Sequence, residues 1–154
     1  GIYNDVDNEW FFLGQRNGFT RMYYNGTTTV ETTSSGVTVT GDVNSSSDIR
    51  YKKNIETIDN ALDKVQSLRG VTFDWDNDAF TADESTKKPN FTARATGVIA
   101  QDVEKVLPEA VRENEDGFKN VSYGNMVGLL IEAIKEQQEQ IDMLTHKIDK
   151  MENL

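Results

Sequence analysis

Apolar and polar residues alternate along the first part of the chain and predict short strands. Residues 1 to about 44 contain the runs "WFFLGQR", "FTRMYY" and "TTTVETT", with Asn17-Gly18 and Asn25-Gly26 between them. Asn-Gly between β-rich runs is typical of a hairpin. The run "GVTVTGDV" alternates valine with threonine, which predicts a further, half-buried strand. This segment has too few apolar residues to close a core alone, so we expect it to pair with more chain upstream, with other copies of itself, or with both.

The pattern changes after the serines at 45–47 to a mixture of helices and strands. "IDNALDKVQSLRG" has apolar residues at helical spacing and ends on Gly70, a typical residue just after a helix. "VTFDWDN" alternates apolar with polar and acidic residues, which predicts a strand. Residues 78–94 are polar and rich in turn-forming residues, so we expect an exposed loop there.

The next segment continues this mixture. "TGVIA" predicts a short buried strand, and "QDVEKVL" predicts a brief helix that Pro108 ends. "EAVREN", "EDG" and "FKNVS" predict a hairpin. The predicted fold class is therefore α+β: an N-terminal strand segment is followed by a small mixed α/β domain that ends in a long helix.

The last segment predicts a long amphipathic helix. From Asn125 onward, apolar residues recur at alternating spacings of three and four over nearly four heptads. In the first turns Leu129, Ile131 and Ala133 widen the apolar face, which favours packing on the chain's own domain. Beyond Glu136 the stripe narrows, which favours a coiled coil between chains. The predicted coiled-coil residues are Ile134, Gln137, Ile141, Leu144, Ile148 and Met151.

Charge and hydropathy exclude several kinds of partner. The chain has 26 acidic residues against 16 lysines and arginines, a net charge of −10. This charge argues against binding the phosphate backbone of nucleic acids or an anionic membrane surface. No window approaches 18 continuous apolar residues, and the N-terminus lacks the plan of a signal peptide. We therefore expect no nucleic-acid partner and no membrane, and, because no initiator methionine is present, a fragment of a longer protein.

Two composition limits restrict the chemistry. The absence of cysteine removes disulfides, thiolate catalysis and cysteine-based zinc sites, and fits a reducing cytosol. His146 is the only histidine, so neither a histidine triad nor a histidine-rich metal cluster can form. The acidic positions of "VTFDWDND" lack the spacing of a calcium-binding EF-hand loop. We expect no metal and no cofactor, and any hydrolytic reaction needs a base other than histidine.

Four stretches, in this order, resemble a known family: "SSSDIRYKKNIETI", "LRGVTFDW", "TGVIAQDVEKVLPEAV" and "NVSYGNMVGLLIEAIKEQQEQI". The family is that of the C-terminal intramolecular chaperone domains of bacteriophage tail fibres, tailspikes and neck appendages, which are self-cleaving peptidases. The resemblance implies a homotrimer that helps an upstream β-structured fibre to fold and then cuts itself off before a serine. It also implies synthesis in the bacterial host cytoplasm, a mature fibre on the virion tail, and release of the chaperone part.

The resemblance assigns roles to the serine-rich segment. The family's Ser-Asp followed by Arg and Lys lies on Ser47, Asp48, Arg50 and Lys52. It implies that Ser47 is the nucleophile, that Lys52 is its base, and that the bond between Ser46 and Ser47 is cut. Asp48 fixes this register, because only Ser47 directly precedes it. Asp48 and Arg50 are the expected supporting residues.

The chemistry of the residues agrees with a lysine base but does not decide whether that lysine belongs to the same chain as the serine. A serine hydroxyl needs a base to take its proton, and a lysine amine is the candidate that remains without a usable histidine. Lysine has an ordinary pKa of about 10.4. A lysine base therefore needs desolvation or neighbouring positive charge to lower that pKa toward neutrality. Residues five apart lie on opposite faces of a strand and about 140° apart around a helix. Either the segment bends, or the lysine comes from a neighbouring chain.

Several interpretations of the whole chain stay open at this point. We expect residues 1–46 to be the β-structured end of a fibre, residues 47–124 the mixed part of the chaperone, and residues 125–154 its coiled-coil helix. The alternative is a non-catalytic trimeric structural or receptor-binding fibre tip, with the serine run as a solvated linker. A third is the related self-cleaving domain of a membrane-bound eukaryotic transcription factor, which the Thr-Gly-Val strand pattern disfavours.

The number of chains in the assembly rests on two opposed arguments. Isoleucine at the first core position of the heptad, with leucine at the other, favours parallel dimers in the general rule. Gln137 interrupts that pattern, and the resemblance implies three chains. We therefore expect a trimer.

Overall fold

The computed structural model describes residues 1–4, 6, 9–79 and 91–153 and has an α+β fold with a long C-terminal helix, as predicted. It divides into two compact units. The first contains Gly1–Lys52 and Asp74–Ala93, and the second contains Lys53–Phe73 and Arg94–Leu154.

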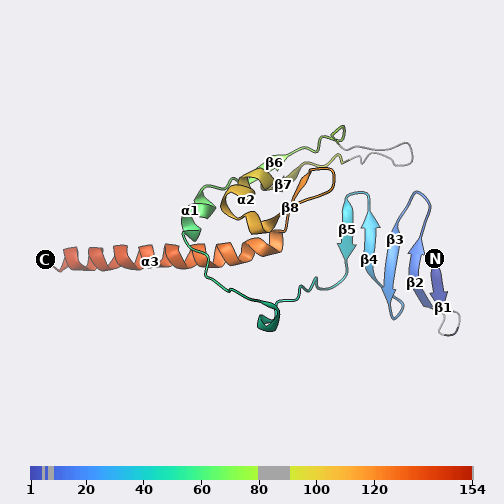
Figure 1. Cartoon of the computed structure of the whole chain (residues 1–154), viewed down its shortest axis with the longest axis horizontal. Helices are drawn as coiled ribbons and strands as arrows, with labels where there is room; N and C mark the ends of the chain where they lie inside the picture. The colour runs from blue at the N-terminus through green and yellow to red at the C-terminus, as the bar shows by residue number, and fades with distance from the viewer. Residues whose placement is uncertain (5, 7–8, 80–90, 154) are drawn as a thin grey trace. The chain divides into compact units, whose positions relative to one another are not determined.

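The first unit contains a five-stranded antiparallel sheet in which the strands follow one another in chain order (Figure 1). The strands are β1 Ile2–Asn4, β2 Glu9–Gly14, β3 Thr20–Tyr24, β4 Thr27–Thr33 and β5 Gly36–Val39. Both predicted hairpins are confirmed. Asn25 and Gly26 form a two-residue turn with φ angles of 49° and 73°, and Asn17 has a φ of 58° in the other turn. These left-handed conformations explain why Asn-Gly occurs at both places.

The strands of this sheet leave their apolar side chains accessible. Directly opposed residues form one row across all five strands: Ile2, Phe12, Met22, Val30 and Val39. No described residue of the first unit is buried. The prediction that β5 is half-buried is therefore wrong for a single chain, since all four of its residues are exposed. The alternating pattern predicted the strand correctly, but the described residues of this chain form no second layer that covers it.

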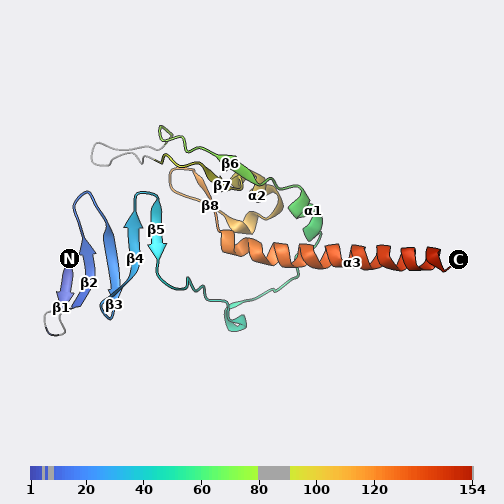
Figure 2. The same cartoon turned by 180° about the vertical axis from the view of Figure 1, so that it is seen from behind.

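The second unit combines helices with two small antiparallel ladders (Figure 2). Its elements are α1 Ala61–Gln66, β6 Val71–Phe73, β7 Ala95–Gly97, α2 Ala100–Val106, β8 Val111–Glu113, β9 Lys119–Val121 and α3 Met126–Glu152. Two 3₁₀ turns, Pro108–Ala110 and Tyr123–Asn125, precede β8 and α3. The strands β6 and β7 pair, as do β8 and β9. The core consists of Ala61, Val103, Leu107, Ala110, Val111, Leu129 and Ala133.

Most predictions for this unit are confirmed, and three boundaries are corrected. The helix α1 ends at Gln66 and its C-cap is Ser67, so Gly70 is not the residue just after it. The end is closed locally, because the Ser67 hydroxyl donates a hydrogen bond of 2.7 Å to the carbonyl oxygen of Lys64. The strand β6 stops at Phe73, where its pairing with β7 ends, and does not continue through Trp75.

The predicted strand in "TGVIA" is shorter and less buried than expected. Only Ala95–Gly97 is extended in a ladder, and its residues are half-buried or exposed. The next residues, Val98 and Ile99, lead directly into α2, of which Ile99 is the N-cap. Pro108 follows α2 as predicted and begins a 3₁₀ turn. Most of the loop predicted at 78–94 lies outside the described residues.

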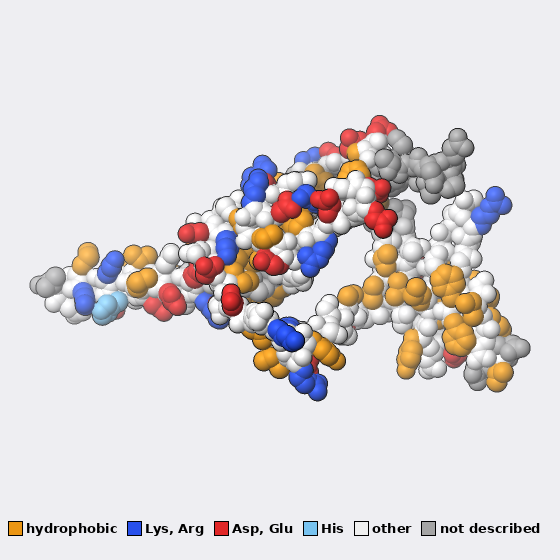
Figure 3. Space-filling model, in the orientation of Figure 1, with side chains coloured by type: hydrophobic (Ala, Val, Ile, Leu, Met, Phe, Trp, Pro, Cys, Tyr) orange, Lys and Arg blue, Asp and Glu red, His pale blue; other side chains and the backbone are white. Residues whose placement is uncertain are grey.

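The helix α3 uses different faces for its own unit and for solvent. Leu129 and Ala133 are buried, as predicted, whereas Ile131 is 49% exposed and does not join the core. The apolar residues of the predicted coiled coil are all exposed, from 48% at Ile141 to 72% at Met151. Figure 3 shows hydrophobic side chains at the surface of this helix and of the sheet. A single chain therefore leaves this apolar stripe uncovered.

A carboxylate of α3 holds the start of α1. The Glu136 oxygens accept hydrogen bonds from the backbone N–H groups of Ala61 and Leu62, each at 2.8 Å. Asn60, although a common N-cap residue, has a left-handed backbone and makes no side-chain cap. Glu136 therefore satisfies two N–H groups that would otherwise lack a partner at the start of this helix.

We expect Glu136→Gln to lower the free energy of unfolding by about 1–2 kcal/mol. A glutamine has only one acceptor oxygen and would turn an NH₂ group toward one of the two N–H donors. Denaturant unfolding of the full chain, followed by circular dichroism at a fixed protein concentration, measures the change. Glu139→Gln is the matched control, because Glu139 is exposed on the same helix. Equal midpoints for the two variants would show that the capping contact contributes nothing.

Candidate functional site

The segment after the serine run forms a tight turn. Residues Ile49–Tyr51 form a 3₁₀ helix with Asp48 as its N-cap. The Asp48 side chain accepts a hydrogen bond from the backbone N–H of Arg50 at 2.8 Å. The backbone N–H groups of Tyr51 and Lys52 donate to the carbonyl oxygens of Asp48 and Ile49. An aspartate at this position caps the first turn by the usual N-cap geometry.

The turn brings the two predicted reactive groups together. The Nζ atom of Lys52 lies 2.8 Å from the Oγ atom of Ser47, within hydrogen-bond distance. The segment therefore bends within one chain, and this contact needs no lysine from a neighbouring chain. A lysine amine in this position is within reach of the hydroxyl proton of a serine, which is the geometry that a general base requires.

An ion pair stabilises the turn from outside. The Arg50 guanidinium binds both carboxylate oxygens of Asp48, with distances of 2.9 Å from Nε and 2.8 Å from Nη2. Hydrogen bonds from the Arg50 side chain and backbone lower the pKa of Asp48, and the Asp48 carboxylate raises the pKa of Arg50. Because the pKa of Asp48 is lowered in the fold, the pairing is present above the ordinary aspartate range and is lost as pH falls through the lowered pKa.

Ser47 and Lys52 are open to solvent in a single chain. Ser46, Ser47 and Lys52 are all exposed, as is the Arg50 side chain, and only Asp48 is half-buried. A lysine acts as a base only where burial or neighbouring cations disfavour its charged form. The described chain thus supplies the contact between hydroxyl and amine but not the burial.

The described residues contain no group of three or more histidine, cysteine, aspartate or glutamate side chains that could hold a metal ion. Within the same part of the chain, no helix has the length and apolar character that crossing a membrane requires.

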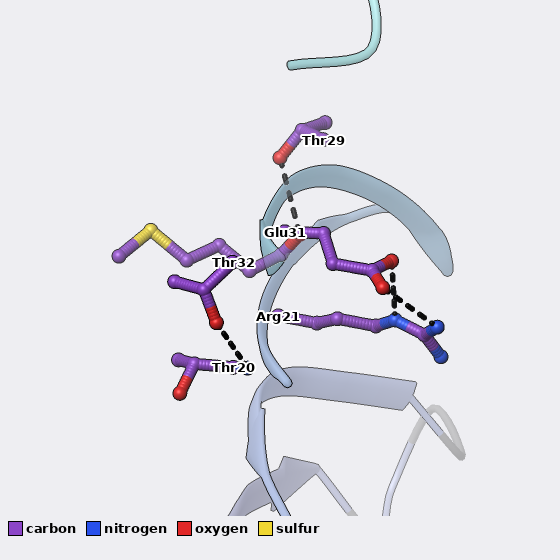
Figure 4. Close-up of polar contacts among 6 residues, drawn as sticks. Thr20, Arg21, Thr29, Glu31 and Thr32 are labelled. Carbon is purple, nitrogen blue, oxygen red and sulfur yellow. Dashed lines mark hydrogen bonds and ion pairs between the residues drawn. The ribbon is translucent and has the colours of Figure 1, made fainter. Parts of the chain in front are cut away.

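A polar cluster on β3 and β4 was not predicted from the sequence (Figure 4). Arg21 forms a two-contact ion pair with Glu31, at 2.8 and 3.2 Å, and lies 3.8 Å above the ring of Phe19. The hydrogen bond with Glu31 raises the pKa of Arg21, and the one with Arg21 lowers the pKa of Glu31. Beside this pair, the Thr32 hydroxyl accepts from the backbone N–H of Thr20 at 2.8 Å. These side-chain contacts link the two strands, and we infer that they stabilise the pairing.

The register of the hairpin explains why the pair was missed. A two-residue turn at 25–26 would place Arg21 opposite Val30 if pairing continued without interruption. A bulge between Met22 and Tyr23 shifts the register, so that Arg21 faces Glu31. Glu136 was missed for another reason, since it caps a helix start 75 residues earlier in the chain. Its only sequence signal is an acidic residue next to the apolar stripe.

Residues 47–112 match the family described as the chaperone of endosialidase, and the match begins at Ser47. The long tail fiber protein Gp37 of Enterobacteria phage K3 is 39% identical over 106 residues, which cover 66% of this chain and 8% of that protein. The protein of the same name from Salmonella phage S16 is 31% identical over 116 residues, which cover 73% of this chain and 15% of that protein. The chain thus spans a small part of these relatives.

Proposed function

We propose that this chain is a self-cleaving intramolecular chaperone, because residues 47–112 match the chaperone-of-endosialidase family and the chain is similar to long tail fiber proteins of phages. It trimerises, assists the folding of an upstream β-structured fibre, and then releases itself by cutting the bond between Ser46 and Ser47. The contact of 2.8 Å between the Lys52 amine and the Ser47 hydroxyl carries this proposal.

The proposed reaction uses only groups of the chain and water. The neutral Lys52 amine takes the hydroxyl proton of Ser47, and the Ser47 oxygen attacks the carbonyl carbon of Ser46. The bond from that carbon to the Ser47 nitrogen breaks, and the protonated lysine supplies a proton to the leaving amine. The resulting ester between Ser46 and the Ser47 oxygen is hydrolysed by water. The products are a carboxylate on Ser46 and a free amine and hydroxyl on Ser47, and no cofactor is consumed.

Assembly gates the proposed cut. In the single chain, Lys52 and Ser47 are exposed, and so is the apolar stripe of α3. Packing three copies through that stripe buries the segment and places its cations close together, and both effects favour the neutral amine. The active base therefore arises only in the oligomer, and the cut waits for assembly.

A removable chaperone has a physical advantage for a fibre. Strands interwoven between chains have many contacts distant in sequence and unpaired edges, so they fold slowly and risk aggregation. A helical bundle forms faster and aligns the chains first. After the cut, residues 1–46 stay with the mature fibre on the virion tail. Residues 47–124 and the helix at 125–154 leave, and the barrier to unfolding of the fibre remains.

The experiment that tests this proposal follows the full-length chain made in a bacterial cytoplasm. We expect denaturing gels and mass spectrometry to show a fragment from Ser47 to Leu154 whose first residue is Ser47. If the assembled chain stays whole, the alternative applies: a non-catalytic trimeric fibre-tip domain that serves a structural or receptor-binding role.

A further inference from the structure

The second unit contains a cavity that the proposed reaction does not use. Its volume is about 460 Å³, within the range of about 300–1,000 Å³ that is typical of binding pockets. Val106, Leu107 and Pro108 supply an apolar wall. Glu56 and Glu109 also line it and form no ion pair with the described residues, whereas Asp59 is held by Lys64 at 3.1 Å. The lining therefore combines an apolar wall with an excess of negative charge, three carboxylates against the one cation of Lys64.

The segment that carries the site has the opposite character. Residues 47–53 contain three basic residues and one acid, in a chain whose net charge is −10. Arg50 neutralises the one acid, Asp48, so this carboxylate does not balance the charges of Lys52 and Lys53. Ile49 and Tyr51 alternate with these cations and are 72% and 78% exposed. Large apolar side chains this exposed, beside cations, fit a pocket that has an apolar wall and an excess of carboxylates.

We propose that the cavity of one copy receives the Ile49–Lys53 segment of a second copy. Ile49 and Tyr51 enter against the apolar wall, and Lys53 lies beside Glu56 and Glu109. The occupant is a second copy because these side chains stay exposed in the single chain, and because the proposed assembly through the exposed stripe of α3 brings a neighbouring copy close. The docking is expected to remove water from the contact between Lys52 and Ser47. The effect of this on cleavage rests on the proposed function.

The absence of cysteine in the natural chain allows a direct test of this contact. The full chain carries Lys53→Cys and Glu109→Cys in a Ser47→Ala background, which keeps it whole. Mild oxidation is expected to give covalently linked chains on a non-reducing denaturing gel. The matched control pairs Lys53→Cys with Glu115→Cys, since Glu115 is exposed in the same unit and does not line the cavity. Linked chains no more abundant than in the control, or a loop closed within one chain, would overturn the proposal.

A second readout separates this proposal from the proposed function. With Ser47 intact, Glu109→Lys places a cation against Lys53 of the second copy, and we expect cleavage to slow by about tenfold or more because like charges that face each other repel. Glu115→Lys makes the same charge change away from the cavity and keeps the normal rate. If Glu109→Lys cuts as fast as Glu115→Lys, the docking does not control the site. If the chain with natural Ser47 never cuts but the linked chains form, the docking stands and the proposed function fails.

Discussion

The variants Ser47→Ala and Lys52→Ala are each expected to leave an uncut chain that still assembles. The mechanism needs both the hydroxyl and the amine, so either loss lowers the cleavage rate by about a thousandfold or more. Lys52→Arg is the sharper form of the second variant, because it keeps the positive charge and removes the usable base. A time course on denaturing gels measures the cut, and light scattering measures the assembly.

The controls for this prediction come from the same segment. Ser45→Ala removes a hydroxyl two residues away and is expected to cut at the normal rate at the same bond. If Lys52→Ala cuts at the normal rate, lysine is not the base, and the role implied by the family resemblance fails at that residue. If Ser47→Ala is cut after residue 46, the nucleophile is another group.

Charges placed in the apolar stripe of α3 are expected to stop assembly and cleavage together. Ile141 and Leu144 are 48% and 58% exposed in the single chain, and we expect them to be buried between copies. Ile141→Glu combined with Leu144→Glu puts two carboxylates from each copy into that interface without pairing them, which costs several kcal/mol per copy, a loss large enough to separate the chains. Cleavage then falls with assembly, although both positions lie far along the chain from Ser47.

Light scattering distinguishes the outcomes of this experiment. The uncut Ser47→Ala chain is expected at three times the mass of 17.3 kDa, and the double variant at the mass of one chain. His146→Glu adds a carboxylate at an exposed position of the same helix, outside the predicted coiled-coil residues, and is expected to change neither mass nor rate. A natural assembly of two chains would contradict the expected trimer. A monomeric double variant that still cuts at the normal rate would show that the site is complete within one chain.

Features that depend on residues close together in the chain were predictable from the amino-acid sequence. The two Asn-Gly pairs predicted both hairpins, because few other residues adopt left-handed backbone at low cost. The periodicity after Asn125 predicted α3, and Pro108 predicted the end of α2. The four stretches that resemble the family also indicated it, since their order is a property of the chain alone.

Features that depend on distant residues or on small local shifts became known from the three-dimensional fold alone. A one-residue bulge moved Arg21 from Val30 to Glu31, and hairpin rules that count from the turn contain no such shift. The start of α1 is capped by Glu136 from another helix, so its own Asn60 gave no reliable signal. The bend that joins Ser47 to Lys52 came from an Asp48 cap and a 3₁₀ turn. Hydrophobic periodicity in a sequence identifies backbone that repeats, as in a strand or a helix. A single 3₁₀ turn does not repeat, so its conformation is known only when its hydrogen bonds are placed in three dimensions.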